Sequence, residues 1–355
     1  MVTNDSRNIE WDSGTAYDFF ASLIVLHEPE RHGLRGSWAA GVRSRLPLAE
    51  RECLQRVVSA LRPMRWVYTL GAPKDALSAL TALRQMEPGP RLAALVPDTS
   101  KGVGRLLRDV AASGQWDDAD VLRLVEMMQS GDWQGRPAAS VRKSALDMLA
   151  AWSDVAGSAD GLLSALEHYY AVFFAEEEVR IRPMLSDALA RARQLATTLP
   201  RPLLLEELSQ GLRLSPEHDR EALVLAPCFW LTPFALVIRL ENGKTLFLFG
   251  ARPADFSLVP GEYVPDALHQ GLKALAEPTR LRILRYLSDE PLAPAELARR
   301  LRLRAPTVIH HLDALRLARL VNVTLDSGEK RYTARPGGAA AVFELLNDFL
   351  AGEED

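Results

Sequence analysis

The sequence predicts a mainly α-helical protein with small antiparallel β elements. Apolar residues recur at the three- and four-residue spacing of helices through roughly the first 200 positions. Alternating apolar runs, which are typical of strands, appear only after position 216 and again near position 321. At 355 residues, with 48% hydrophobic and 25% charged side chains, the chain is long enough for several globular cores. We expect an N-terminal helical domain over 1–215, a short β-hairpin or meander with a connector over 216–264, and a C-terminal module of helices and a hairpin over 265–355.

The first predicted domain is built from helices. Ser13 is a suitable N-cap for the first helix, and Pro29 ends that helix. The Glu87-Pro88-Gly89-Pro90 stretch predicts a break between two helices, and Pro183 predicts a kink or a break in the last helix. Helices are expected over 13–28, 48–61, 73–83, 101–113, 117–130, 137–156 and 160–197.

The residues after Pro216 are rich in strand-forming side chains. Asn242-Gly243 lies between the apolar runs 234–240 and 245–249, and this dipeptide is the strongest short signal for a hairpin. Together with the run 222–229, these segments predict a three-stranded antiparallel sheet. The proline-rich stretch 251–265 would connect the sheet to the last domain, with Leu258 and Tyr263 available for packing there.

Residues 272–332 follow the order helix, helix, helix, hairpin. Pro294 and Pro306 each stand where the first residue of a helix would lie, a position that needs no amide proton. Residues 321–325 alternate in polarity before the turn at Asp326-Ser327-Gly328. This order predicts a winged helix-turn-helix, whose second short helix, 306–317, would enter a DNA major groove. Each of the three helices in this segment has one apolar stripe. The stripes are formed by Leu281, Leu284 and Leu287, by Leu297 and Leu301, and by Val308, Leu312 and Leu315.

The charge of this segment supports nucleic acid as its partner. The whole chain has a net charge of −4, with 42 Lys and Arg against 46 Asp and Glu. Residues 270–335 carry 13 Lys and Arg against 7 Asp and Glu, a net of +6. A basic module on an acidic body is typical of phosphate contact confined to one end of a protein. The alternative is that these arginines form an ordinary solvated helix face.

Three motifs in the segment resemble the ArsR/SmtB family of bacterial transcriptional regulators. They are AEPTRLRIL at 276–284, AELA at 295–298 and TVIHHL at 307–312, in the order and spacing of the family. The resemblance covers roughly the last 90 residues of the chain. It implies a dimeric DNA-binding repressor whose recognition helix contains Thr307 and His310 and whose wing is the 321–333 hairpin.

Four departures from the family pattern bear on function. Leu292-Ala293-Pro294 stands where members often carry a cysteine pair, and 338–350 lacks the histidines with which members can bind metal. Arg302 occupies a turn position that is usually Gly, and would cost about 1 kcal/mol if its backbone is left-handed. Ile309 replaces a Ser of the recognition helix, which favours contact with a thymine methyl group over a hydrogen bond. The resemblance therefore supports DNA binding and weakens metal sensing.

The expected DNA contacts divide into base contacts and backbone contacts. Residues 306–317 would lie in the major groove, and Lys330 and Arg331 of the wing would reach the backbone or the minor groove. His311 has two possible roles: it either packs beside Leu315 or holds a phosphate. The base-facing set is Thr307, Ile309 and His310 with Arg304 near the start of the helix, and the phosphate set is Arg280, Arg299, Arg300 and Arg302.

The last helix has an apolar face that a small domain can hardly cover. A two-fold contact in a homodimer would bury this face. Docking of the helix against the N-terminal body is the alternative. The residues expected at the dimer contact are Val342, Phe343, Leu346, Phe349 and Leu350.

The sequence contains no signal of catalysis or of a cofactor, and we interpret the cluster of His27, Glu28, Glu30 and His32 as a solvated turn at a helix end rather than as a metal site. No phosphate-binding loop, dinucleotide-binding glycine motif, nucleophile elbow or zinc-hydrolase histidine spacing occurs. Cys53 and Cys228 are two distant thiols that are expected to behave as buried apolar residues. The N-terminus has no secretory signal, and no apolar run is long enough to span a bilayer. We expect a cytoplasmic protein that is not an enzyme.

The role of the helical domain is open. Its aromatic residues either form an ordinary core or line an apolar pocket for a small-molecule or protein effector of unknown identity. The leading hypothesis is a bacterial transcription repressor that acts as a homodimer on double-stranded operator DNA. A protein-interaction adaptor that uses the winged module without DNA is the rival, and an enzyme in the helical domain is a third reading. The aromatic group comprises Trp11, Tyr17, Phe19, Phe20, Trp38, Trp66, Tyr68, Tyr169, Tyr170, Phe173 and Phe174.

Overall fold

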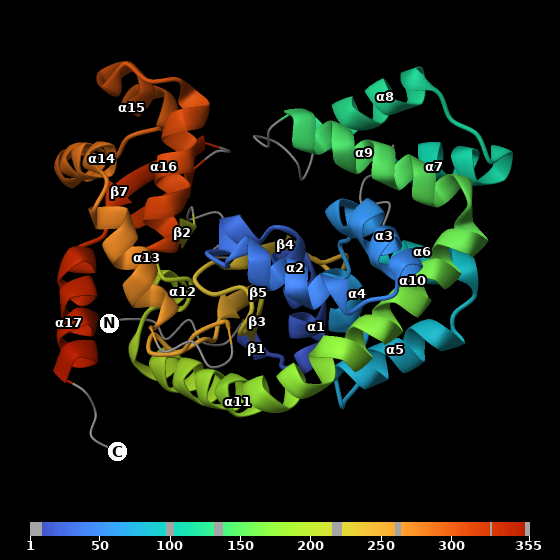
Figure 1. The fold of residues 1–355 in the computed structure, drawn as a ribbon, viewed down its shortest axis with the longest axis horizontal. Coiled ribbons are helices and arrows are strands. Elements are labelled where there is room, and N and C mark those ends of the chain that lie inside the picture. Colours follow the sequence, from blue (N-terminus) through green and yellow to red (C-terminus); the bar gives the residue numbers. More distant parts are fainter. Residues whose placement is uncertain are drawn as a thin grey trace. The chain divides into compact units, whose positions relative to one another are not determined.

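The computed structural model describes residues 9–96, 103–130, 138–214, 222–259, 264–326 and 329–351. These residues form two compact units (Figure 1). The helical unit contains residues 14–27 and 39–180. The winged unit contains the described residues of 1–13, 28–38 and 181–355. The fold class is as predicted: mainly helical, with small sheets and a winged helix-turn-helix at the C-terminal end.

The two units do not follow the three predicted domains. Residues 181–214 and the sheet after residue 222 belong with the helix-turn-helix rather than with the preceding helices. The physical reason is a shared core, in which leucines of residues 204–225 pack in one cluster with Leu287, Leu312 and Val323. A division drawn from composition misses this core, because its members are far apart in the sequence.

The helical unit is arranged around one almost completely buried helix, α1 (Thr15–His27). Two polar residues of this helix, Asp18 and Ser22, are also buried, and Ser22 lies 2.9 Å from the hydroxyl of Tyr169. The other helices are α3 (Leu48–Val57), α4 (Met64–Thr69), α5 (Ala76–Gln85), α6 (Pro88–Leu95), α7 (Val103–Ser113), α8 (Asp118–Gln129), α9 (Ala138–Ser153) and α10 (Val155–Tyr169), while α2 (Gly36–Ser44) and α11 (Ala175–Thr198) contribute residues to both units.

Three predictions about the helical unit are corrected. Helix α5 begins after Asp75, whose carboxylate accepts a hydrogen bond from the amide of Ser78, and not at Pro73. Helix α6 begins at Pro88 inside the expected break, because proline is favoured in the first turn of a helix. The long last helix is interrupted by a π-helical segment at Tyr170–Phe174, whereas Pro183 lies within α11.

The winged unit contains a four-stranded mixed sheet of order β1-β3-β5-β4, formed by Ile9–Trp11, Leu223–Cys228, Thr245–Gly250 and Leu236–Arg239. The predicted hairpin is confirmed, since β4 and β5 are antiparallel. The predicted all-antiparallel arrangement is wrong, because β3 runs parallel to β5 and to β1. Strand β3 is buried along its whole length, as is typical of a central parallel strand, and the partly exposed β4 takes the edge.

The helix-turn-helix is formed by α13 (Asp266–Leu275), α14 (Pro278–Asp289), α15 (Pro294–Leu301) and α16 (Ala305–Leu317). The wing strands β6 (Val321–Asp326) and β7 (Glu329–Ala334) follow, and then α17 (Gly338–Ala351). The predicted turn residues Ser327 and Gly328 lie outside the described residues, as does Tyr263. In Figure 1, α15 and α17 lie at opposite ends of this module.

Two of the three predicted apolar stripes are confirmed. Val308, Leu312 and Leu315 of α16 are fully buried, and Leu297 and Leu301 of α15 are buried beside them. The stripe on α14 is corrected, since Leu281 is 47% exposed and the buried pair is Ile283 and Leu287. These two are spaced i, i+4 and therefore share one face of the helix, which Leu281 does not.

An additional strand supports the wing from outside the predicted DNA module. Strand β2 (Leu212–Leu214), which follows α12 (Arg201–Leu208), runs parallel to β6. Gly211 precedes β2 with φ +114°, and a Cβ at this position would lie 2.3 Å from the side-chain oxygen of Asn322. The amide of Asn322 donates to Glu206 at 3.1 Å, and Arg213 donates to the same carboxylate oxygen at 2.7 Å. The wing is therefore fastened to α12.

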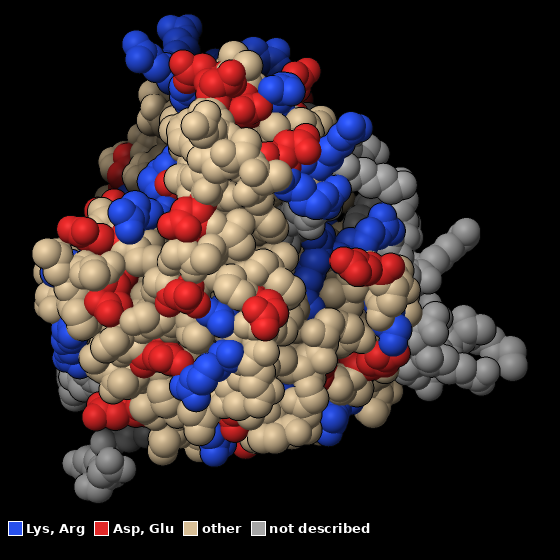
Figure 2. All heavy atoms as spheres, turned by 90° about the vertical axis from the view of Figure 1, so that its right-hand side faces the viewer, with Lys and Arg blue, Asp and Glu red and all other residues tan. Residues whose placement is uncertain are grey.

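The face of the molecule in Figure 2 carries acidic and basic side chains interspersed with one another. Such mixing is expected of a solvated surface without a single polyanionic partner. Among the described helices, none has the length and apolarity that crossing a membrane requires.

Candidate nucleic-acid interface

Helix α16 presents two different faces. Its inner face carries the buried Val308, Leu312 and Leu315, whereas the side chains at positions 304, 307, 309 and 310 are exposed. Ile309 is 44% exposed and is therefore available for contact with a partner. The helix begins after Arg304, which makes no side-chain cap hydrogen bond. The exposed sequence-predicted residues on this helix and its cap are Arg304, Thr307, Ile309 and His310.

The turn before α16 brings several arginines together. Arg302 adopts the left-handed conformation expected from its place in the turn, with φ 56° and ψ 42°. The amide of Leu303 then donates to the carbonyl of Ala298 at 3.0 Å, which closes the end of α15. Because α15 ends and α16 begins at this turn, Arg299, Arg302 and Arg304 all lie at the same end of the module.

Three of the predicted cations form no ion pair among the described residues. Within the part of the chain that the structure describes, Arg299, Arg302 and Arg304 are exposed and form no ion pair. Sequence reasoning missed Arg282 and Arg285 on α14, which are likewise exposed and unpaired among the described residues. The signal was present in the sequence, because basic residues alternate with the apolar ones in TRLRILRYL and must face outward once Ile283 faces the core.

Three other predicted cations are engaged within the module. Arg300 lies 2.7 Å from Glu290 and over the ring of Tyr286, and Arg280 lies 3.6 Å from Glu277. In the wing, Arg331 lies 3.5 Å from Glu296 and donates to the carbonyl of Pro291 at 3.4 Å. The neighbouring Lys330 is exposed.

Glu296 joins the wing to the start of α15. Its carboxylate accepts a hydrogen bond from the amide of Ala293 at 2.7 Å, which satisfies a free donor at the helix N-terminus. This hydrogen bond, with the nearby Arg331, lowers the pKa of Glu296. A phosphate that binds Arg331 would therefore compete with a carboxylate that already has a structural role.

His311 faces inward, unlike its neighbour His310. Its Nδ1 atom lies 3.5 Å from Glu277, and only 15% of its side chain is exposed. Burial lowers the pKa of His311, and Glu277 opposes this effect. Glu277 is also the N-cap of α14 and accepts from the amides of Thr279 and Arg280; although burial alone would raise its pKa, these hydrogen bonds lower it. Of the two readings of His311, the geometry favours packing.

The residues predicted for dimerisation divide into two groups. Val342 is buried, and its methyl groups fill the space beside Gly271 of α13, where a Cβ would lie 2.7 Å from them. It therefore belongs to the core of its own chain. Phe343 and Leu350 are 53% and 71% exposed, and Leu346 and Phe349 are half-buried. The outer face of α17 thus remains apolar.

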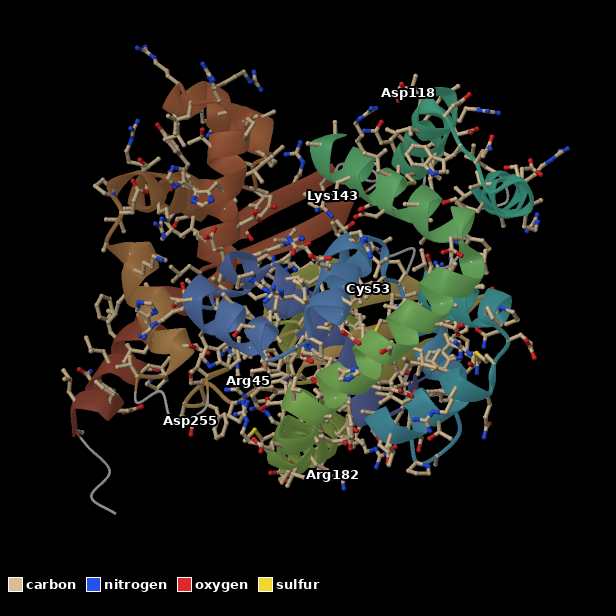
Figure 3. The ribbon with its side chains drawn as sticks, turned by 45° about the vertical axis from the view of Figure 1, so that its right-hand side comes forward. Arg45, Cys53, Asp118, Lys143, Arg182 and Asp255 are labelled. Atoms are coloured by element: carbon tan, nitrogen blue, oxygen red, sulfur yellow. The ribbon has the colours of Figure 1, made fainter. Side chains whose placement is uncertain are left out.

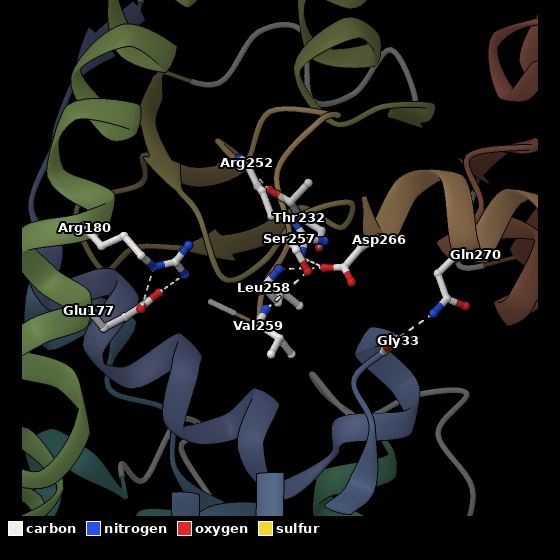
Figure 4. A network of polar contacts seen from close by, with 10 residues as sticks. All are labelled: Gly33, Glu177, Arg180, Thr232, Arg252, Ser257, Leu258, Val259, Asp266 and Gln270. Carbon is white, nitrogen blue, oxygen red and sulfur yellow. Dashed lines mark hydrogen bonds and ion pairs between the residues drawn. The ribbon is translucent and has the colours of Figure 1, made fainter. Parts of the chain in front are cut away.

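The first helix of the module is fixed by a polar network (Figure 4). Arg252 forms a buried ion pair with Asp266, the first residue of α13, at 2.7 Å, and donates to the carbonyl of Thr232 at 3.1 Å. The same carboxylate oxygen of Asp266 accepts from the amide of Leu258 at 2.6 Å. Gln270 of α13 donates to the carbonyl of Gly33. Residues 251–259, the described part of the connector after the sheet, therefore support the module.

The aromatic group of the helical unit packs as a core. The ring of Phe19 lies 5.0 Å from Phe20, 5.2 Å from Phe174 and 5.7 Å from Tyr169, in edge or tilted geometries. Phe19, Phe20 and Phe174 are fully buried. Trp11 and Trp38 belong to the winged unit, where Trp38 stacks on Trp230. This packing supports the core reading of the group over an apolar pocket.

The helical unit shows no assembled metal centre in its described residues, and the same holds for the described winged unit. Figure 3 shows Cys53 on α3 and Lys143 on α9. Cys53 is half-buried, and burial raises the pKa of its thiol, while Cys228 is buried in β3. Neither thiol is thereby made more reactive.

The fold and the exposed face of α16 define a winged helix-turn-helix protein, and comparisons identify its family. The model of the bacterial regulatory protein arsR family matches residues 277–323. The HTH-type transcriptional regulator CmtR of Mycobacterium tuberculosis is 39% identical over 84 residues, which are 23% of this chain and 71% of CmtR. The HTH-type transcriptional regulator Rv2034 of the same organism is 40% identical over 85 residues, 24% of this chain and 77% of that regulator. No solved structure matches the chain significantly.

This chain belongs to the arsR family and is a transcriptional regulator of that family. The family match covers α14, α15, α16 and the start of the wing. The helical unit lies entirely outside the matched residues.

Proposed function

We propose that this regulator represses transcription by binding a pseudo-palindromic operator as a homodimer, with α16 in the major groove. The observation that carries the proposal is the set of exposed side chains in the N-terminal half of α16, namely Thr307, Ile309 and His310. Arg299, Arg302 and Arg304 lie beside them and form no ion pair among the described residues. Thr307, Ile309 and His310 would contact base edges, and Arg304 would lie at the groove entrance. Arg299 and Arg302 would contact phosphates, and the exposed Arg282 and Arg285 would do the same.

The engaged cations have a different part in the proposal. Arg280 and Arg300 of the predicted phosphate set would leave or share their carboxylate partners to reach DNA, as would Arg331 of the wing. Exchange of a carboxylate for a phosphate yields less affinity than a free cation would, because one favourable ion pair is lost. Lys330 and Arg331 would contact the backbone or the minor groove.

The outer face of α17 would form the dimer contact. Phe343, Leu346, Phe349 and Leu350 offer the apolar area, and a two-fold axis would bury the same face on both copies. Sedimentation of the Phe343→Ser variant tests this contact, with Leu48→Ser, an exposed leucine of the helical unit, as the control. We expect only the first variant to become monomeric.

Sensing by this regulator would not use metal. The segment before α15 carries Leu292-Ala293-Pro294 instead of a cysteine pair, and α17 contains no histidine. We propose that the remainder of the chain outside the DNA module, comprising 1–215 and 216–264, serves an organic effector or a protein partner.

Selection of bound genomic fragments, followed by mobility shifts at several salt concentrations, tests DNA binding directly. We expect Arg304→Ala to weaken binding to all duplexes and to reduce the slope of log affinity against log salt by about 1. Arg45→Ala, an exposed arginine of the helical unit labelled in Figure 3, is the matched control and should bind as the wild type. Absence of duplex binding in dilute buffer would contradict the proposal and favour the protein-interaction adaptor.

A further inference from the structure

The winged unit contains a cavity of about 670 Å³ at the far end of α16 from the exposed arginines. It lies among α11, α12, the segment after β5, the end of α16 and the first turns of α17. All of its lining residues belong to the winged unit. Its size is within the range of pockets that hold small molecules.

One wall of this cavity is cationic. Arg252, Arg319 and Arg335 line it, and Arg252 is already neutralised by Asp266 (Figure 4). Arg335 donates to the backbone carbonyl of Gln210 at 3.3 Å. Within the described part of the chain, no carboxylate lies within ion-pairing distance of Arg319 or Arg335. Two guanidinium groups therefore face this cavity without a counter-charge.

The charge of Arg319 is less favourably placed than that of Arg335. Arg319 is half-buried, and its backbone is left-handed, with φ 58°. Burial lowers the pKa of Arg319 to about 10, and the positive charges of Arg252 and Arg335 add to this effect. A guanidinium in such surroundings gains more from a bound anion than an exposed guanidinium does, because water screens the interaction less.

The acidic residues of the cavity do not neutralise the positive charge of this wall. Glu207 lies 3.6 Å from Arg191, which also lines the cavity. All four of the acidic lining residues are exposed, and they are therefore hydrated. They are Asp187, Glu207, Glu344 and Asp348.

Further donors and an apolar wall complete the site. Gly337 and Gly338, the first residue of α17, line the cavity, and a helix N-terminus favours an anion. Gln210 also lines it, and the NH₂ group of its side-chain amide is a hydrogen-bond donor that an anion can use. The apolar part of the lining includes Leu195, Phe249, Leu317 and Leu345.

We propose that this cavity binds a small organic anion, with its carboxylate or phosphate held by Arg319 and Arg335 and its apolar body against Phe249 and Leu317. The regulatory part of this inference rests on the proposed function. Arg319 follows α16 by two residues, and Val342 of α17 both lines the cavity and packs on α13. A ligand here would therefore link the end of α16 to the start of α17.

Calorimetric titration of the full chain tests the site without DNA. Benzoate and phenyl phosphate are the two anionic probes, and benzyl alcohol is the neutral probe of the same shape. We expect at least one of the two anions to bind, and the alcohol to bind at least tenfold more weakly than that anion. The anion that binds more tightly shows whether the site prefers a carboxylate or a phosphate. Equal binding of the alcohol and both anions, or no binding of either anion, would overturn the proposal.

Variants locate the anion within the cavity. Arg319→Gln and, separately, Arg335→Gln should weaken the bound anion by about 10- to 100-fold. Arg191→Gln is the matched control, because Arg191 lines the same cavity but is exposed and paired with Glu207, and it should bind within about twofold of the wild type. Urea unfolding shows whether each variant folds. If Arg319→Gln does not fold, Arg335→Gln alone tests the site. Binding within about twofold of the wild type in both Arg319→Gln and Arg335→Gln would show that the anion binds elsewhere.

Mobility shifts with the selected duplex, with and without the bound probe, test regulation. We expect the probe to change duplex affinity at least threefold in the wild type and to have no effect in Arg319→Gln. Unchanged affinity in the presence of a saturating probe would overturn the regulatory part. If the anion binds through Arg319 but no duplex is bound at all, the cavity assignment stands and the operator proposal fails.

Discussion

The two ends of α16 lie in opposite environments. At the N-terminal end, Arg304, Thr307 and His310 are exposed, and the neighbouring Arg299 and Arg302 form no ion pair among the described residues. At the C-terminal end, Leu315 is fully buried and Arg316 lies over the ring of Phe234 at 5.1 Å. The two ends are about 20 Å apart, because a helix of 13 residues rises about 1.5 Å per residue.

This difference indicates how one short helix can serve two roles. The buried end fixes the helix in its own unit, where the ring of His32 packs edge-on against Phe234 at 5.5 Å. The exposed end is left with side chains that the fold itself does not need. In the proposed regulation, a displacement at the buried end would reach the exposed end through this helix.

The largest expected difference between the faces of α16 is in stability. Leu312→Ala removes a fully buried side chain and should lower the free energy of unfolding by about 2–5 kcal/mol. Ile309→Ala, three residues earlier on the outer face, should change it by less than about 0.5 kcal/mol. Urea unfolding measures both values. Similar losses for the two variants would contradict the assignment of the inner and outer faces.

The buried end of α16 should also make stability dependent on pH. Burial, with the charges of Arg31 and Arg252, lowers the pKa of His32 from 6.5 to about 3. Between these values the unfolded chain binds the proton and the folded chain does not, so the free energy of unfolding falls as the pH falls from 6.5 towards 3. From pH 7 to pH 5 this histidine should account for a loss of about 2 kcal/mol.

Urea unfolding of His32→Leu at the two pH values measures this contribution. The variant should lose less stability than the wild type over the same interval. The control His269→Leu changes an exposed histidine of α13 and should retain the wild-type dependence. The same pH dependence in His32→Leu as in the wild type would show that the histidine is not held neutral by burial.

The exposed end should carry sequence discrimination. His310→Ala should reduce the preference for the selected duplex over a single-base variant by about 1–3 kcal/mol at the contacted position, with little change in stability. His311→Ala should instead affect folding more than base preference, because His311 faces Glu277. Binding to a panel of duplexes with single changes measures the discrimination. An unaltered preference in His310→Ala would place base contact elsewhere.

The smallest expected effect concerns the turn before α16. Arg302→Gly should raise the free energy of unfolding by about 1 kcal/mol, because glycine adopts φ 56° without strain. Arg299→Gly removes the same charge from the interior of α15 and should lower it by about 1 kcal/mol. Both variants should lose a similar amount of duplex affinity. Stabilisation without any loss of affinity in Arg302→Gly would exclude this arginine from the interface.

The winged module was predictable from the sequence because its signals are local. Helix spacing, Pro294, Pro306 and the strained Arg302 all act within a few residues. The parallel pairing of β3 with β5 and of β2 with β6 was not predictable, since it joins segments far apart in the chain. Exposure at Thr307 and His310 follows from the helical period, whereas the engagement of Arg300 by Glu290 depends on side chains from different helices.

The cavity at the buried end was beyond the reach of local patterns. Arg319 and Arg335 are ordinary basic residues in the sequence, and only the packing of α11 and α12 around the end of α16 leaves them facing a cavity. From the sequence, an apolar pocket among the aromatic residues of the helical domain was only an alternative to an ordinary core, and rings such as Phe19 and Phe174 pack against each other there.

Hydrogen–deuterium exchange of the full chain, with and without the selected duplex, tests most directly whether the exposed N-terminal end of α16 binds DNA. We predict that the duplex slows exchange in peptides covering α15 and the first half of α16, residues 294–311, and in the wing. Peptides of the helical unit within 103–130 should exchange as they do without DNA. Unchanged exchange over 294–311 while another part of the molecule is protected would contradict the account.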